Sequence, residues 1–126
     1  MATILLVDDD PLQAFIRKSI LERRFSDVWR VADAADALCL IEQPLFAENL
    51  GLVISGHHTQ GIGGPAFVAE LNTRMPYLAV LVLGNAAESA RDYPSDHVCF
   101  LPWPVISEGI LTMADRMLTL NERKTA

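Results

Sequence analysis

Three consecutive carboxylates, Asp8, Asp9 and Asp10, follow directly on an apolar run of β-forming residues at positions 4–7. Such a run is typical of a strand that is buried on both faces. Pro11 suits the first position of a helix, with Asp10 as its N-cap. In an open parallel sheet, ligands bind at the carboxyl ends of the strands. The three acids therefore lie where a functional site is expected.

Strand-like and helix-like segments alternate along the whole chain. Strands are predicted at residues 3–7, 28–32, 50–55, 77–83 and 97–101. A first helix is predicted between the first two strands, where Leu12, Phe15, Ile16 and Ile20 recur at helical spacing. Further helices are predicted at residues 33–43, at 65–74 and from Ser107 to about Asn121. Pro44 ends or kinks the helix at residues 33–43. The segment from Asn85 to Asp96 leaves room for two helical turns at most. The pattern predicts an α/β fold, a (βα)5 doubly wound parallel sheet with helices on both faces. We expect one domain over residues 1–121 and a frayed tail over residues 122–126.

Composition argues against several functional classes. The chain has 126 residues and a formal net charge of −6, so no basic surface is available to neutralise nucleic-acid phosphates. No apolar run reaches membrane-spanning length, and the N-terminus lacks the basic lead of a signal peptide, so we expect a cytoplasmic protein. Cys39 and Cys99 lie in apolar sequence, which favours buried free thiols over a disulfide.

Four stretches, taken together at their separations, resemble the receiver domain of response regulators, the CheY-like family. They are residues 4–11, residues 52–55, the glycine-rich turn at 61–64 and residues 100–104. The resemblance implies the flavodoxin-like strand order 2-1-3-4-5 and transfer of a phosphoryl group from a histidine kinase to an aspartate, with Mg²⁺. It also implies that Asp8 and Asp9 correspond to the acidic pair that helps to hold Mg²⁺, and that Phe100 corresponds to a switch-like aromatic residue.

Three positions depart from the family pattern. Gly56 stands where the phosphoacceptor aspartate ends the third strand, Gly84 where a hydroxyl residue ends the fourth, and Trp103 where a lysine ends the fifth. Glycine has no nucleophile, so no acyl phosphate can form at residue 56. We predict a stand-alone pseudo-receiver that is not an enzyme and acts by phosphorylation-independent protein binding.

The altered site leaves several alternatives open. With one carboxylate lost, no cofactor is expected beyond a weak Mg²⁺ site at Asp8, Asp9 and the carbonyl of His58. His57 and His58 read as loop residues rather than as a transition-metal site. The indole of Trp103 is predicted to cover the two glycines, and the Trp103–Pro104 bond is either cis or trans. Two other functions compete with this prediction. The first is phosphotransfer with an unconventional acceptor, either Asp10 or a histidine. The second is a sensor that binds a small ligand at this pocket.

The last predicted helix carries a wider apolar stripe than one core-facing side requires. The stripe is taken as an interaction surface, formed by Ile110, Leu111, Met113, Met117 and Leu118. We expect it to bind a protein partner, either a histidine kinase, another response regulator or a second copy of this chain as a homodimer.

Overall fold

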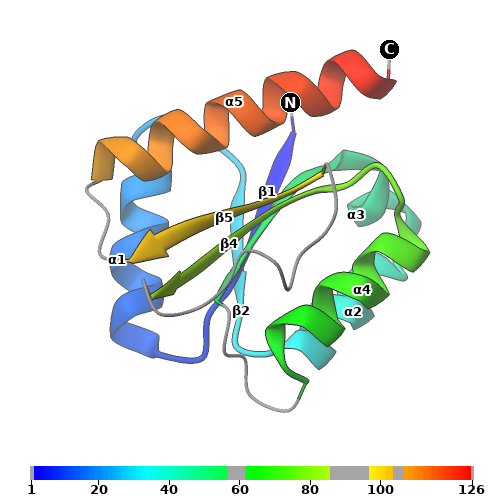
Figure 1. Ribbon diagram of the computed structural model, residues 1–126, viewed down its shortest axis with the longest axis horizontal. Helices are drawn as coiled ribbons and strands as arrows, with labels where there is room; N and C mark the ends of the chain where they lie inside the picture. Colours follow the sequence, from blue (N-terminus) through cyan, green and yellow to red (C-terminus); the bar gives the residue numbers. More distant parts are fainter. Residues whose placement is uncertain (1, 57–61, 86–96, 104–106, 126) are drawn as a thin grey trace.

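In the described residues, five parallel strands form one sheet between two layers of helices (Figure 1). The computed structural model describes residues 2–56, 62–85, 97–103 and 107–125, without the side chains of Asn85, Trp103 and residues 120–125. The strands are β1 (Thr3–Val7), β2 (Val28–Val31), β3 (Leu50–Gly56), β4 (Ala79–Asn85) and β5 (Val98–Trp103). The helices are α1 (Pro11–Leu21), α2 (Ala34–Ile41), α3 (Pro44–Asn49), α4 (Gly64–Arg74) and α5 (Ser107–Thr125). The order β2-β1-β3-β4-β5 confirms the predicted doubly wound fold.

Alternation along the strands builds two hydrophobic cores, one on each face of the sheet. On β1, Ile4 and Leu6 pack with α1 and α5, whereas Leu5 and Val7 pack with α2 and α4. All four side chains are at most 1% exposed. Successive side chains of a strand point to opposite faces, so a continuous apolar run is what a sheet covered on both sides requires.

Local signals set the helix starts. Asp10 accepts hydrogen bonds from the backbone N–H groups of Leu12 and Gln13, and Pro11 follows as the first helical residue, as predicted. Asp33 caps α2 in the same way, through the N–H of Asp36. The interruption expected at Pro44 divides the segment into α2 and the short helix α3, because proline cannot donate within a helix yet fits its first turn.

Three of the four apolar residues that predict α1 face solvent, whereas the fourth, Ile20, is half-buried. Leu12, Phe15 and Ile16 are 69%, 70% and 49% exposed. The side of α1 that packs on the sheet carries Ala14, Arg17 and Leu21 instead. The spacing therefore predicted the helix correctly, but the larger apolar side chains lie on its outer face.

The prediction that the last helix presents an exposed interaction surface is wrong. Its apolar side chains pack onto the sheet within this chain, and Met113 is half-buried against the same core. The buried members are Ile110 at 1% exposure, Leu111 at 3%, Met117 at 7% and Leu118 at 9%. The cause lies partly on β3, where Gly51 has no side chain: a Cβ there would lie 2.8 Å from Cδ2 of Leu118. This close approach lets α5 bury a wide stripe.

The same helix is longer than predicted. It continues to Thr125, so residues 122–125, which we expected as a frayed tail, are helical. Glutamate, arginine and lysine in this stretch are good helix formers, and a helix already anchored by its preceding turns extends readily through them.

Both cysteines are free thiols, but they differ in exposure. Cys39 is exposed on α2, so the expectation of burial is wrong for it. Cys99 is half-buried on β5, with its Sγ 3.8 Å from Sδ of Met113, and burial raises the pKa of its thiol. Among the described residues, no helix has the length and apolar character needed to cross a membrane.

Candidate functional site

The carboxyl ends of neighbouring strands bring the predicted site positions to one edge of the sheet. Val7 pairs with Ser55, so the residues that follow them, Asp8 and Gly56, lie at the same level. Gly56 in turn pairs with Leu83, and Gly84 with Pro102. Of the predicted residues, Asp8, Gly56 and Gly84 therefore converge on this acidic edge, as the sheet order requires.

Asp8 is buried and meets a cation from its own chain. Its side chain is 4% exposed and that of Arg17 is 7% exposed, and Nη1 of Arg17 lies 3.0 Å from Oδ2 of Asp8. The other carboxylate oxygen, Oδ1, accepts a hydrogen bond of 3.0 Å from the backbone N–H of Asp10. Both oxygens of Asp8 are thus engaged by N–H donors.

Burial dominates the electrostatics of this pair. It raises the pKa of the Asp8 carboxyl above its ordinary value of 3.8, and the N–H of Asp10 and the charge of Arg17 act in the opposite direction. Burial also lowers the pKa of the Arg17 guanidinium, while Asp8 raises it. Each charge is costly to bury alone, so the two depend on each other.

Backbone contacts hold the same turn from a second side. Arg30 of β2 donates to the carbonyl oxygen of Asp8 through Nε at 3.1 Å and Nη2 at 2.7 Å. Asp10 is occupied as the N-cap of α1. Asp9 is exposed. Of the three acids, one is paired internally, one caps a helix and one faces solvent, so they do not converge on a common point.

This arrangement fits poorly with a divalent cation. Mg²⁺ requires oxygen ligands in near-octahedral geometry, usually one or two carboxylates with waters. The oxygens of Asp8 already receive N–H donors, and Oδ1 of Asp10 receives two. Within the part of the chain that the structure describes, no group of three histidine, cysteine or acidic side chains could hold a metal ion.

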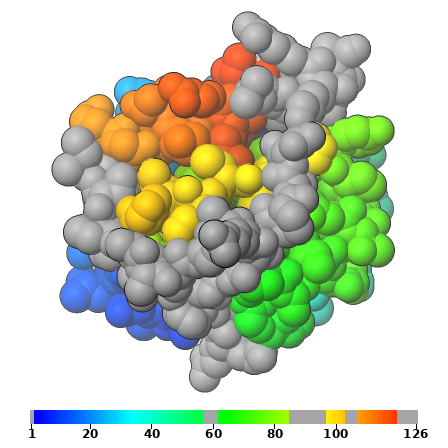
Figure 2. All heavy atoms as spheres, in the orientation of Figure 1, coloured from blue at the N-terminus to red at the C-terminus, as the bar shows by residue number. Residues whose placement is uncertain are grey.

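Several predicted features lie outside the described residues. They include His57, His58, the side chain of Trp103 that was expected to cover the glycines, the Trp103–Pro104 bond and most of the segment from Asn85 to Asp96. Phe100, the switch-like position, is half-buried on β5 and packs against the core shared with α2 and α4. Figure 2 shows atoms of β5 at the surface between α5 and α4, as expected for an edge strand.

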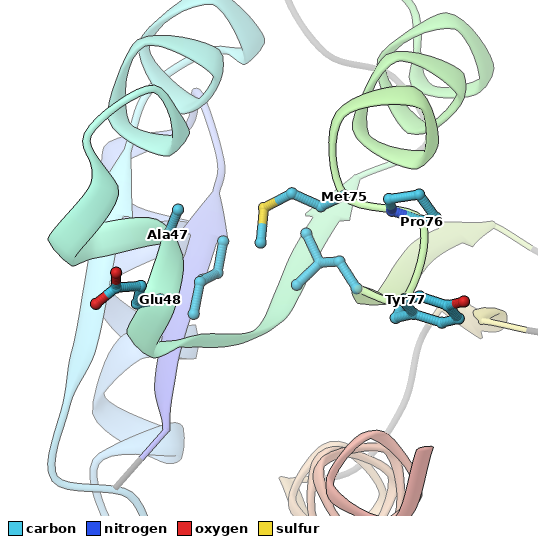
Figure 3. A pocket seen from close by; sticks show the side chains of 7 residues that line it. Ala47, Glu48, Met75, Pro76 and Tyr77 are labelled. Carbon is cyan, nitrogen blue, oxygen red and sulfur yellow. The ribbon is translucent and has the colours of Figure 1, made fainter. Parts of the chain in front are cut away.

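A separate cavity lies at the other end of the strands, beside the starts of β3 and β4 (Figure 3). Its volume is about 310 Å³, and it is lined by Ala47, Glu48, Leu50, Met75, Pro76, Tyr77 and Leu78. The carboxylate of Glu48 and the hydroxyl of Tyr77 lie at its margins rather than together. Leu50 begins β3 and Leu78 precedes β4, so this cavity is remote from Asp8. It lacks the convergent polar groups that orient a small ligand.

Comparison with solved structures shows which proteins share this architecture. A CheY-like response regulator receiver domain from Methanospirillum hungatei JF-1 aligns with a TM-score of 0.84 and 21% identity over 98% of each chain. A receiver domain from Clostridium thermocellum aligns with a TM-score of 0.84 and 17% identity, over 97% of this chain and 98% of that one. This chain has the receiver-domain fold. The receiver domain of an HD domain-containing protein from Pseudomonas fluorescens Pf-5 aligns similarly, with a TM-score of 0.83, 21% identity and coverage of 97% and 98%. No model of a known protein family matches the sequence, and no curated protein sequence matches it.

Sequence reasoning missed Arg17, the residue that pairs with the buried carboxylate of Asp8. A signal was present, because Ala14, Arg17 and Leu21 recur at spacings of three and four, which is the period of one helix face. The stronger apolar repeat of Leu12, Phe15 and Ile16 lies on the opposite face of the helix. A charged residue within a helical apolar repeat indicates a buried partner of opposite charge.

Proposed function

We propose that this chain is a pseudo-receiver, a receiver-fold binding module of two-component signalling that works without being phosphorylated. It carries no enzymatic activity of its own and acts in the cytoplasm on a protein partner such as a histidine kinase or a response regulator. The single observation that carries the proposal is the ion pair between Arg17 and Asp8 beside a third strand that ends in Gly56.

Gly56 removes the reacting atom. The resemblance to receivers implies a phosphoacceptor at the end of β3, and Gly56 occupies that end, at the level of Asp8. An acyl phosphate needs a carboxylate oxygen to attack phosphorus, and glycine has none. The same edge also has Gly84, the last residue but one of β4, where the resemblance expects a hydroxyl group.

Arg17 supplies a substitute for the missing cation. We propose that its guanidinium neutralises Asp8 and so makes the edge independent of Mg²⁺. The distance of 3.0 Å and the burial of both side chains support this, since a buried carboxylate needs a counter-ion and this one is covalently part of the chain.

The alternative of an unconventional acceptor finds less support. Asp10 receives two backbone N–H groups at the start of α1, and a phosphoryl group on its oxygen would compete with this cap. Loss of an N-cap costs about 1 kcal/mol. A modification at Asp10 would therefore act against the helix that carries Arg17.

The experiment is intact-mass spectrometry of the full chain after incubation with Mg²⁺ and a small phosphodonor such as acetyl phosphate. The matched sample carries Gly56→Asp, Gly84→Thr and Trp103→Lys, which restore the three missing groups, and also Arg17→Leu, which frees Asp8. We expect no phosphate adduct on the native chain and a Mg²⁺-dependent adduct on the repaired one.

A phosphate adduct on the native chain would overturn the proposal, and mapping the modified residue would then identify the acceptor. Comparing the repaired chain with and without Arg17→Leu tests the cation argument separately. If the adduct forms equally well when Arg17 is retained, the guanidinium does not displace Mg²⁺, and that part of the proposal fails.

A further inference from the structure

The outer face of α1 is an exposed apolar stripe formed by Leu12, Phe15 and Ile16. These side chains are 49% to 70% exposed, and their spacing of three and four places them on one side of the helix. Single exposed apolar residues need no explanation, but three large ones gathered on one helix face are typical of a contact surface.

A groove borders this stripe. It has a volume of about 230 Å³ and is lined by Pro11, Ala14, Phe15, Lys18 and Arg30, between α1 and the edge strand β2. Phe15 belongs to both the stripe and the groove, so a large side chain that packed against Phe15 would also reach the groove. Buried aromatic anchors that fill such hollows contribute most of the energy of many interfaces.

The charges at the two ends of α1 are opposite. Asp9 and Asp10 are exposed at the start of the helix, and Arg23 is exposed just after its end. Asp9 and Arg23 stand seven positions before and after Ile16. Asp9 lies two residues before α1 begins and Arg23 two residues after it ends, so the two charges flank the helix at opposite ends.

From these observations we propose that the chain forms a homodimer through two antiparallel α1 helices. In that arrangement the stripes face each other around Ile16, and Asp9 of each copy meets Arg23 of the other. Phe15 of each copy seats near the groove of its partner. A face that is complementary to itself under a twofold rotation is what an isologous dimer requires, and antiparallel helix dipoles favour the same orientation.

This dimer differs from the one first expected on the last helix, because the apolar side chains of α5 are buried within the chain. It also does not depend on whether the acidic edge is phosphorylated. The contact involves one helix of 11 residues from each copy, so we expect a weak dimer with a dissociation constant in the micromolar range.

Sedimentation equilibrium of the full chain tests the proposal, from about 1 to 500 µM, a range that spans micromolar dissociation constants. Phe15→Ser is expected to weaken the dimer by at least about tenfold, since it removes the central aromatic side chain. Leu45→Ser on α3 is the matched control: Leu45 is 77% exposed and Phe15 70%, but Leu45 lies outside the stripe. We expect the control to dimerise like the native chain.

Charge-reversal variants test the antiparallel orientation of the two α1 helices. Asp9→Lys or Arg23→Glu alone places like charges together and is expected to weaken the dimer several-fold, whereas the two changes combined restore opposite charges and recover the native dissociation constant. Circular dichroism on each variant verifies the fold. A native chain that stays monomeric over the whole range overturns the proposal. So does a dimer that Phe15→Ser leaves intact, or one in which the combined reversal gives no recovery.

Discussion

Helices α1 and α5 cover the same face of the sheet but distribute their side chains in opposite ways. α5 buries its wide apolar stripe and contributes to the core through Ile110 and Leu118. α1 exposes its larger apolar residues and buries the charged Arg17 against Asp8. The two helices also touch, and Arg24 after α1 forms an ion pair with Asp115 of α5. Thus one layer combines a conventional core helix with a helix anchored by a salt bridge.

The difference shows that periodicity identifies a helix without identifying its buried face. A hydrophobic stripe normally turns inward because burial of each large apolar side chain contributes roughly 1.5 to 3 kcal/mol. On α1, a buried acid at the end of β1 needs a counter-ion, and only the inward face can supply it. The need to neutralise Asp8 is one force that holds Arg17 inside, and the adjacent apolar residues then fall on the outer face.

The largest expected effect comes from breaking the α1 anchor. Arg17→Met leaves the Asp8 carboxylate buried without its counter-ion and should lower the free energy of unfolding by about 3 to 5 kcal/mol. Combining it with Asp8→Leu should recover most of this loss, because neither charge then remains. Urea unfolding of the single and double variants measures the coupling between the two residues.

Lys18→Met is the control for this cycle, since Lys18 neighbours Arg17 but pairs with Glu22 at the surface. It should lower the free energy of unfolding by less than about 1 kcal/mol.

The pH dependence of the coupling gives a second test of the ion pair. Burial raises the pKa of Asp8 above 3.8, so protonation should abolish the coupling at a higher pH than for an exposed aspartate. Coupling that persists unchanged at pH values well below that pKa contradicts the ion-pair account.

The same substitution on the two helices compares them directly. Ile110→Ala on α5 removes a side chain that is 1% exposed and should cost about 2 to 4 kcal/mol, whereas Ile16→Ala on α1 removes one that is 49% exposed and should cost about 0.5 kcal/mol or less. Thermal or urea unfolding in dilute, monomeric solution gives both values. Equal losses would mean that α1 and α5 contribute alike to the core.

A smaller effect is expected where α5 approaches β3. Gly51→Ala places a Cβ 2.8 Å from both Cδ2 of Leu118 and Cβ of Ala2, and should destabilise the fold by about 1 to 3 kcal/mol. Adding Leu118→Ala should reduce the penalty of the Gly51 change, because one of the two close contacts disappears. Gly63→Ala, where no atom lies within 4 Å, is the control and should change stability by less than about 1 kcal/mol. A Gly51 penalty that is no larger than the control excludes close packing as the cause.

Much of the fold could be predicted because its signals are local and repeated. β1 was predicted with both its bounds, and α1 with Asp10 as N-cap and Pro11 after it. Strand order followed from the alternation of strands and helices together with the receiver resemblance. The bounds of single elements depend on short stretches of chain, where apolar periodicity and proline stereochemistry suffice.

The site was less predictable because its chemistry depends on contacts between separate elements. The meeting of Asp8 with Gly56 at one edge could be foreseen from sheet topology. The pairing of Asp8 with Arg17, nine residues away, could not, since it depends on how α1 is rotated about its axis. The burial of Leu118 likewise depends on how closely α5 approaches β3 at Gly51, which helical spacing alone does not reveal.

The cation that meets Asp8 is carried by the same chain, and this changes how the contact responds to the surroundings. A tethered group acts at an effective concentration that the tether sets, in the millimolar range even for short flexible linkers. Here most of the tether is the helix α1 itself, which confines the guanidinium far more closely. A chelator or a falling ion level can strip a dissolved cation from a carboxylate. Arg17 stays at Asp8 until α1 rotates or the domain unfolds.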